Sequence, residues 1–486
     1  MKKLYAYWID ILSYFGEHYP ALYFACFFLL GMAGYFSFFL ALLSLPLLIR
    51  KHLAKNILFM SCGFFFFQFH APPSLKTPLQ GSGIFQIHEI KKHVSPFNSC
   101  LVYEGTLKSF QTAGKALHRL PCRIYSHQRK NHPQADQDYL LTSATLIETA
   151  PHRFVLKPQK KTPWIPIKKS HSLAEKRFQL KEKTKSYLHQ HYKTKREHAL
   201  MTALLTGNLE NRLLAFQFGQ VGLQHLLAIS GFHFALLSFF LLFLLRRFFS
   251  SRAASALLLI LLTVYFLYMG SAPSISRAWI GVFIFLIGTF FHYRPTALNA
   301  LGIALFAALI SDPLVLFQIG FQLSFAATLG ILLFYAPFEK KLQLLLPKRS
   351  YQEATQLNCL DQWGYLLAAY LRNVLALNGA VLMFILPLLL FHFQKFPLIS
   401  LAYNLFFPLL FSVLIALLFL ALLFPPLHLV SNLYASFVLD LVTYAPKRLM
   451  FYLRVPEFPL GVLVIILLGV YIGGIQSRFR KRISLK

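Results

Sequence analysis

The chain has 486 residues, of which 56% are hydrophobic and 16% aromatic, and its mean hydropathy of +0.54 excludes an ordinary soluble globular protein. Its formal net charge is +31, and nearly half of that excess lies in one hydrophilic block, residues 71–200. Long apolar runs recur along the rest of the chain, so we expect an α-helical polytopic membrane protein.

Residues 1–70 are predicted to hold the N-terminal membrane spans. Residues 20–49 are apolar but interrupted by glycines and a proline, and they fit two short spans or one bent span. The basic turn RKHLAK, residues 50–55, precedes a further span. The positive-inside rule puts the N-terminus and this turn in the cytoplasm, which requires two crossings before the turn and one after it. The first apolar run lacks a cleavage site, so we expect a retained span and no signal peptide.

The hydrophilic residues 71–170 are predicted to form an external domain. Turn residues alternate there with β-rich runs at residues 83–90, 101–110, 122–127, 139–148 and 153–157. Five strands in this length predict a small β-barrel, and a five-stranded OB-fold is the natural candidate, although strand count alone does not separate it from other small barrels. The positive charge favours either a polyanion such as nucleic acid or a solvated surface near anionic lipid.

The external block carries the residue types that bind single-stranded DNA, which occupies basic grooves lined with aromatic side chains. The candidate cations are Lys91, Lys92, Lys108, Arg123, Arg129 and Lys130. The candidate aromatic platforms, for which a place in the core is the alternative, are Phe85, Phe97, Tyr103, Phe110, Tyr125 and Tyr139. Cys100 and Cys122 could close a loop of about 22 residues as a disulfide if the block faces an oxidising compartment.

Residues 171–215 are predicted to form a basic amphipathic helix and a linker. From Leu173 to Thr206, apolar residues recur at helical spacing among many lysines. This pattern favours a helix that lies along the membrane interface, and a solvated linker helix is the alternative.

Residues 216–475 are predicted to be a polytopic domain, followed by a basic cytoplasmic tail at 476–486. Its apolar segments are residues 224–245, 253–270, 277–292, 296–311, 314–335, 363–391, 398–424, 427–446 and 457–474. With the N-terminal spans they predict about 12 crossings, within a range of about 9 to 12. Basic loops then place both termini in the cytoplasm and residues 71–200 outside.

Three clusters of polar residues interrupt the apolar segments, where unpaired polar groups are costly. They are His225, Ser230 and His233, with Gly231 between the last two as a further candidate; Ser274, Ser276 and Arg277; and Asp312, Gln318, Gln322 and Ser324. Interhelical hydrogen bonds would explain any one cluster, at about 0.6 kcal/mol per bond. Three clusters together favour the lining of a shared polar pathway.

Catalysis is a weaker interpretation of the same residues. Ser230 with His233 or His225, oriented by Asp312, would give the residue types of an intramembrane hydrolase, but the serine lacks a G-x-S-x-G elbow. The sequence has no G-x-x-x-x-G-K-[ST] loop, CxxC motif or Cys/His zinc spacing. We therefore expect no enzyme activity, no metal and no cofactor.

Four motifs follow one another between about residues 200 and 420. They are FGQVGLQHLLAISGFHFAL (218–236), SAPSISRA (271–278), DPLVLFQIGFQLSFAATLGIL (312–332) and ILPLLLFHFQKFPLISLAYNLFFPLL (385–410), the last with Asn404 in register. In type and order they resemble the motifs of the bacterial competence (ComEC) family of DNA-uptake channels. Phe232, Asn208 and the pair Asn378-Gly379 depart from the family pattern, which leaves the details of pore lining open.

The resemblance implies a channel that passes single-stranded DNA across the cytoplasmic, or inner, membrane during natural transformation, with the external domain binding the incoming strand. It adds Asn404 to the pore-lining candidates. The implied partners are single-stranded DNA, membrane lipid, an external DNA receptor, and a cytoplasmic motor ATPase or single-strand-binding protein, with a homodimer left open. Many family members continue into a metallo-β-lactamase-like domain, so strand degradation would need a separate nuclease. A transporter of a small or lipidic anion is the alternative function.

Overall fold

The computed structural model describes most of the chain. The described residues are 13–35, 52–72, 75, 77–94, 99–112, 116–127, 133–150, 153–159, 163–169, 173–192, 194–270, 272–293 and 295–483. Of the predicted N-terminal crossings and their basic turn, residues 36–51 fall outside them. Arg129, Lys130 and Phe97 also lie outside the described residues.

Two N-terminal helices, α2 (Pro20–Gly34) and α4 (Leu53–His70), pack with their backbones close together. A Cβ atom on Gly31 would lie 2.0 Å from the carbonyl oxygen of Met60, and one on Gly63 would lie 2.2 Å from that of Phe28. Small residues permit this approach between helices in a membrane. Asn56 Nδ2 donates to the Tyr23 hydroxyl at 2.9 Å across the same contact.

The hydrophilic block forms a six-stranded sheet. Its strands are β1 (Leu79–Val94), β2 (Ser99–Gln111), β3 (Ala116–His127), β4 (Gln137–Ala150), β5 (Arg153–Pro158) and β6 (Ile165–Lys169). Each of the five predicted runs lies inside one of the first five strands, and only β6 was missed. Strand β1 pairs with both β2 and β4, β3 pairs with β2 and, in parallel, with β5, and β5 pairs with β4.

The predicted amphipathic helix is in fact two helices, α5 (Leu173–His191) and α6 (Lys195–Thr206). The prediction of one helix was wrong because Tyr192, at the break, is buried, and its hydroxyl donates to Ser431 Oγ at 2.9 Å. Helix α5 contacts both β1 and the bundle helix α10 (Ser251–Met269). It therefore joins the sheet to the helical part of the molecule.

Helices make up the remainder of the chain. They are α7 (Arg212–Gln220), α8 (Gln224–Leu227), α9 (Gly231–Leu245), α10, α11 (Pro273–Phe290), α12 (Ala297–Ser311), the 3-10 helix η3 (Pro313–Phe317), α13 (Ile319–Leu342), α14 (Tyr351–Thr355), α15 (Cys359–Phe393), α16 (Ser400–Leu423), α17 (Leu427–Thr443), the 3-10 helix η4 (Lys447–Leu449) and α18 (Leu460–Ile483). Strands β7 (Lys395–Pro397) and β8 (Tyr452–Arg454) pair antiparallel and tie the α15–α16 loop to the segment before α18.

Six helices within the described residues are long and apolar enough to cross a membrane, which supports a multi-pass membrane protein. They are α10, α11, α13, α15, α16 and the apolar part of α18. Four shorter apolar helices accompany them, namely α2, α9, α12 and α17. The larger count of crossings expected from the sequence stays a prediction.

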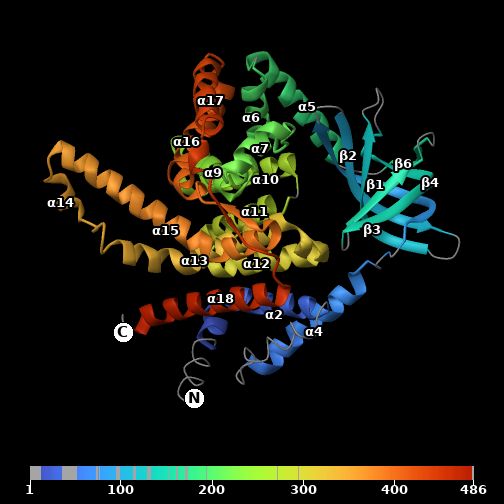
Figure 1. Cartoon of the computed structure of the whole chain (residues 1–486), viewed down its shortest axis with the longest axis horizontal. Helices are drawn as coiled ribbons and strands as arrows, with labels where there is room; N and C mark the ends of the chain where they lie inside the picture. The colour runs from blue at the N-terminus through green and yellow to red at the C-terminus, as the bar shows by residue number, and fades with distance from the viewer. Residues whose placement is uncertain are drawn as a thin grey trace.

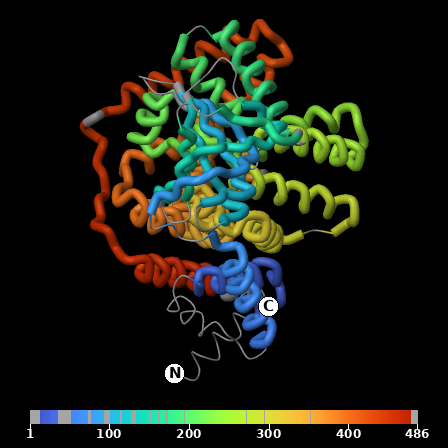
Figure 2. Tube along the Cα trace, turned by 90° about the vertical axis from the view of Figure 1, so that its right-hand side faces the viewer, coloured from blue at the N-terminus to red at the C-terminus, as the bar shows by residue number. Residues whose placement is uncertain are grey.

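The sheet and the α14 end of the molecule lie at opposite ends of its long axis (Figure 1). Helices α13, α15 and α18 run along that axis, whereas α9, α10 and α11 extend sideways from the body (Figure 2). One apolar core joins α2, α12, α13, α15 and α18, and a second joins α6, α7, α16 and α17. Near its start, α11 contacts both the start of α9 and the second turn of α13.

Candidate functional site

Helix α9 begins at a capped break in the apolar segment that was predicted to be continuous from residue 224. The short helix α8 ends at Leu227, and Ser230 is the N-cap of α9. The Ser230 amide donates to His233 Nδ1 at 3.3 Å, and Ser230 Oγ lies 3.2 Å from the same nitrogen. This is a capping box with histidine at the third helical position. The spacing of Ser230 and His233 is thus explained by helix capping.

The start of α11 contacts the same break. Ser274 Oγ donates to the carbonyl of Ile229 at 3.0 Å. Arg277 Nε donates to Ser324 Oγ on α13 at 2.9 Å. A Cβ on Gly231 would lie 3.0 Å from Arg277 Nη2, so the guanidinium packs against the first residue of α9. We call Ser230, Gly231, His233, Ser274, Arg277 and Ser324 the polar junction.

The junction combines members of all three predicted clusters, but Asp312, Gln318 and Asn404 form no described contact with it. Asp312 Oδ1 accepts from the Leu314 amide at 3.0 Å and so caps η3. Gln318 is the exposed N-cap residue of α13. Asn404 Oδ1 is buried without a partner in the described part of the chain, while its carbonyl accepts from Asn378 Nδ2 at 3.2 Å.

No carboxylate bonds to His233 or His225 in the residues that the structure describes, so the orienting group of a catalytic triad is missing from these contacts. The His225 side chain on α8 is exposed. The same residues contain no group of three or more His, Cys, Asp or Glu side chains that could hold a metal ion.

A second polar contact lies where the sheet meets the helices, and it includes a residue that the sequence analysis missed. His392 Nε2 on α15 donates to Gln322 Oε1 at 2.6 Å, and Gln322 Nε2 donates to the Leu316 carbonyl at 2.8 Å. Arg153 Nη2 of β5 donates to the Phe317 carbonyl at 3.2 Å. The available signal for His392 was its position in the apolar run LLLFHF.

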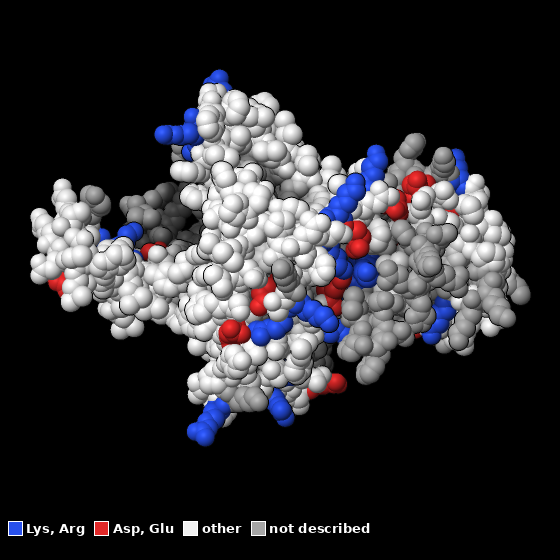
Figure 3. All heavy atoms as spheres, turned by 90° about the horizontal axis from the view of Figure 1, so that it is seen from above, with Lys and Arg blue, Asp and Glu red and all other residues white. Residues whose placement is uncertain are grey.

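Three of the four described candidate DNA-binding cations of the sheet are paired with carboxylates. Lys91 Nζ lies 3.2 Å from Glu89 and 2.7 Å from Glu104, and Arg123 lies 2.9 Å from Glu104. Lys108 Nζ lies 2.6 Å from Asp138. Cations and carboxylates alternate on the surface between the sheet and the helices (Figure 3). Although burial alone would raise the pKa of Glu104, Lys91 and Arg123 outweigh it and hold that pKa below its ordinary value.

Most of the candidate aromatic platforms are core residues. Phe85, Tyr103, Phe110 and Tyr139 are each at most 5% exposed, whereas Tyr125 is 52% exposed. Tyr125 on β3 is therefore the one described member of that set with a ring open to a ligand.

The predicted disulfide between Cys100 and Cys122 is contradicted, because both thiols are free. Cys100 pairs in register with His127, whereas Cys122 pairs with Gly105. Five positions along a strand separate the α-carbons by about 16 Å, far beyond the reach of a disulfide. Burial raises the pKa of the Cys122 thiol to about 12, so it is an inert core residue.

Comparison with known proteins matches the helical part of the chain. A model of the family described as Competence protein matches residues 211–480, more than half of the chain. ComE operon protein 3 of Bacillus subtilis (strain 168) is 30% identical over 193 residues, which are 40% of this chain and 21% of that protein. The match thus spans about a fifth of the length of that relative. No solved structure matches the chain.

Proposed function

This chain belongs to the competence protein family, and from that premise we propose that it serves DNA uptake during transformation as a membrane channel for single-stranded DNA. The observation that carries the proposal is the polar junction within the region that the family model matches. Near the starts of three otherwise strongly apolar helices, Ser274 of α11 donates to the Ile229 carbonyl before α9, and Arg277 packs against Gly231 of α9 and donates to Ser324 of α13. Water-filled paths through a membrane require such groups, and lipid-facing helices do not.

The pore-lining set that we propose keeps all the predicted residues, ordered by the contacts that support them. The polar junction stands first, and Gln322, with its bond to His392, stands second. His225, Asp312, Gln318 and Asn404 remain in the set on the resemblance of their motifs alone. We propose no catalytic role for any of them.

The sheet supports a role in receiving the strand. Its pairings return from β4 to β1 and include the parallel pair of β3 and β5, and we infer from this circuit an OB-like barrel. Among the described candidates, Lys92 is the cation that forms no ion pair. Tyr125 is the aromatic residue whose ring lies outside the core. We keep the other candidate cations as proposed DNA contacts. On binding, Lys91, Lys108 and Arg123 would leave their carboxylate partners and pair with phosphates of the DNA. Arg129 and Lys130 remain in the proposed set as well.

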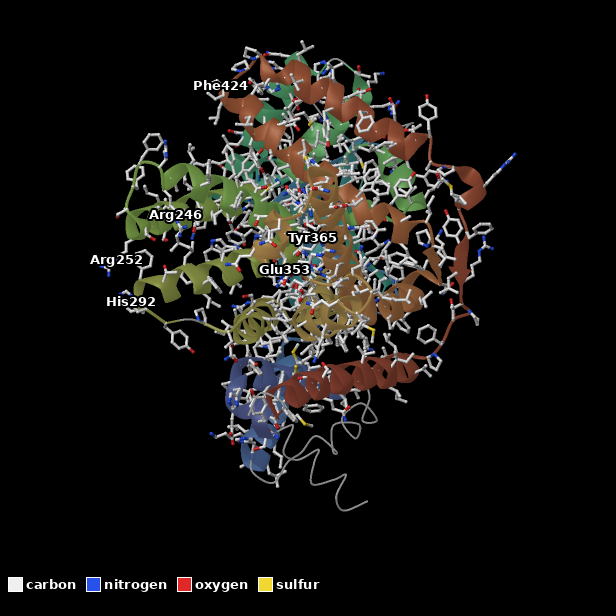
Figure 4. All side chains as sticks on the ribbon, turned by 90° about the vertical axis from the view of Figure 1, so that its left-hand side faces the viewer. Arg246, Arg252, His292, Glu353, Tyr365 and Phe424 are labelled. Atoms are coloured by element: carbon white, nitrogen blue, oxygen red, sulfur yellow. The ribbon has the colours of Figure 1, made fainter. Side chains whose placement is uncertain are left out.

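The orientation that we propose puts the sheet outside the cytoplasmic membrane and both termini in the cytoplasm. The far ends of α9, α10 and α11 are basic: Arg246, Arg252 and His292 lie together on one side of the molecule (Figure 4), and Arg252 Nη2 lies 3.3 Å from His292 Nε2. The domain boundaries at 70, 170, 215 and 475 are part of the same proposal. We also propose the partners that the resemblance implies. They are an external receptor, a cytoplasmic motor or single-strand-binding protein, a separate nuclease, membrane lipid and a second copy of the chain in a homodimer.

Deletion of the gene provides the direct test. We expect labelled DNA to bind the surface of cells without this protein but to stop reaching the cytoplasm, and the full chain supplied in trans to restore entry. Fluorescence microscopy with nuclease treatment of surface DNA separates the two locations. Unchanged entry of DNA together with altered envelope lipids would instead favour a transporter of a lipidic anion.

A further inference from the structure

We propose that Arg277, at the polar junction, is a binding site for one phosphodiester group. The inference deepens the proposed function, and it depends on that function only for the source of the phosphate, which is either a DNA strand or a phospholipid headgroup. The experiment below distinguishes these sources from each other and from the absence of any site.

Arg277 carries a charge that no carboxylate in the described part of the chain neutralises. Its one polar contact there is the neutral Ser324 hydroxyl, at 2.9 Å from Nε. The described ion pairs of arginine and lysine all lie elsewhere, in the sheet, between Lys185 and Glu210, and between Arg196 and Asp440. An unpaired cation among apolar helices is costly, and a bound anion would remove that cost.

The surrounding helix ends add positive potential. Arg277 lies near the start of α11 and contacts the first residue of α9, and Ser324 lies near the start of α13. The first turns of all three helices lack acidic residues. Helix N-termini carry partial positive charge and exposed amides, so they favour an anion and disfavour an isolated guanidinium.

Donor groups without partners are present on α11 and in the first turn of α9. Neither Nη1 nor Nη2 of Arg277 forms a hydrogen bond within the described residues, and Gly231 leaves open the space beside Nη2 that a side chain would fill. Nε2 of His233, two residues further along α9, is buried and also without a partner there. Because Nδ1 of His233 accepts from the Ser230 amide, the neutral ring carries its proton on Nε2.

A phosphodiester fits these donors better than a carboxylate or a halide does. Guanidinium presents two parallel N–H groups that match two oxygens of one phosphate. With Nε already bonded to Ser324, the Nη groups remain for that contact. Lysine would supply the charge without the fork, so Arg277→Lys should bind at an intermediate level.

The test uses the full chain in nanodiscs of zwitterionic lipid. The probes are oligothymidylate, the same oligomer with an uncharged methylphosphonate backbone, and phosphatidylglycerol added to the disc. The variants are Arg277→Gln, Arg277→Lys and Gly231→Ala, whose methyl group would displace the guanidinium. Gly281→Ala, at a site on α11 with nothing within 4 Å of the added carbon, is the matched control.

We expect Arg277→Gln and Gly231→Ala to weaken binding of at least one phosphodiester probe about tenfold, as loss of a charge-assisted hydrogen bond predicts, and Gly281→Ala to bind like the unaltered chain. Loss of oligothymidylate binding alone assigns the phosphate to a strand, and loss of retained phosphatidylglycerol, seen by native mass spectrometry, assigns it to lipid. Equal binding by all variants to both probes overturns the site, as does equal loss of the methylphosphonate oligomer. DNA entry into cells, measured separately, reports on the proposed channel whichever result is found.

Discussion

Lys181 is a charged residue buried at the junction of the sheet and the helices. It is 5% exposed, and its Nζ donates to the Met269 carbonyl at 2.9 Å. Arg177, one turn earlier on α5, donates from Nε to the Leu267 carbonyl at 2.8 Å. The two side chains satisfy carbonyls that the end of α10 leaves open, as cations at helix C-termini do.

Burial lowers the pKa of Lys181 to about 8, which outweighs the opposing effect of Glu89. Below pH 8 the lysine is charged in both the folded and the unfolded chain, so its desolvation cost is fully present. Between pH 8 and about 10.5 only the unfolded chain keeps the proton, and the free energy of unfolding should rise by up to about 1.4 kcal/mol per pH unit.

Lys181→Met should remove that rise, whereas Lys183→Met, at an exposed position on the same helix, should retain it. Denaturant titrations of the three proteins in detergent across this pH range measure the difference. Parallel pH profiles for all three would show that Lys181 is not desolvated.

Single residues of the candidate site were predictable where they were anomalous. Ser230, His233 and Arg277 were selected because polar residues in apolar runs require a partner, and each has one. Lys181 was not selected, because a lysine on a basic amphipathic helix resembles a solvated one. Its partner is a backbone carbonyl about 88 residues away, and side-chain patterns carry no signal for such a contact.

At the scale of elements, Glu104 on β2 holds together the cations of its two neighbouring strands. It lies opposite Arg123 in the register and also bonds to Lys91 of β1 at 2.7 Å. Half-exposed pairs of this kind contribute about 0.2 to 1 kcal/mol each. The same carboxylate competes with any phosphate for both cations.

Glu104→Gln should therefore weaken the fold and strengthen DNA binding together. We expect the thermal midpoint to fall by a few degrees and affinity for oligothymidylate to rise several-fold at low salt, with a steeper dependence on salt concentration. Glu182→Gln changes the net charge equally but breaks no ion pair among the described residues. If both variants bind alike, only net charge matters and these cations do not contact the strand.

Most elements were predictable from the sequence, and their boundaries were less so. The nine apolar segments from residue 224 onward overlap all of the helices from α8 to α18 except the short helices α14 and η4, because long apolar runs specify helices wherever backbone groups must be satisfied internally. Three breaks were missed, one of them at Gln318 between η3 and α13. The break before Gly231 has a local cap signal in Ser230, whereas the break at Tyr192 depends on a contact with α17 that no local pattern encodes.

At the scale of the whole molecule, Arg153 links the sheet to the helices. Its side chain donates a hydrogen bond from β5 to the Phe317 carbonyl, in the segment before α13. It ends beside Gln318 and within two helical turns of the contact between Gln322 and His392. If the sheet binds the incoming DNA strand and the polar junction conducts it, this hydrogen bond keeps the sheet in a fixed position relative to the junction.

Arg153→Gln should leave DNA binding by the full chain nearly unchanged while reducing entry of DNA into cells. Lys157→Gln, at an exposed position of the same strand, is the matched control and should affect neither. Filter binding and the uptake assay measure the two steps separately. A parallel loss of binding in Arg153→Gln would mean that the arginine contacts DNA and does not act as a positioning residue.

The global arrangement was the least predictable level. Composition indicated a polytopic helical protein with one β domain, and the structure has that character. The contacts of α11 with the start of α9 and with Ser324 of α13 depend on how apolar surfaces pack against one another. Apolar helices carry little sequence information about which neighbour they choose.

Helix α15 is longer than a membrane crossing requires. Its 35 residues span about 52 Å, against a hydrocarbon thickness of about 30 Å. Even a tilt of about 40° leaves it longer than the bilayer core, so one end must stand clear of the lipid tails. The exposed Trp363 near its first turns suits the headgroup layer. With Trp363 at that level, α14 lies close to one membrane surface, and the length of α15 sets how far its other end, at Phe393, stands beyond the opposite surface.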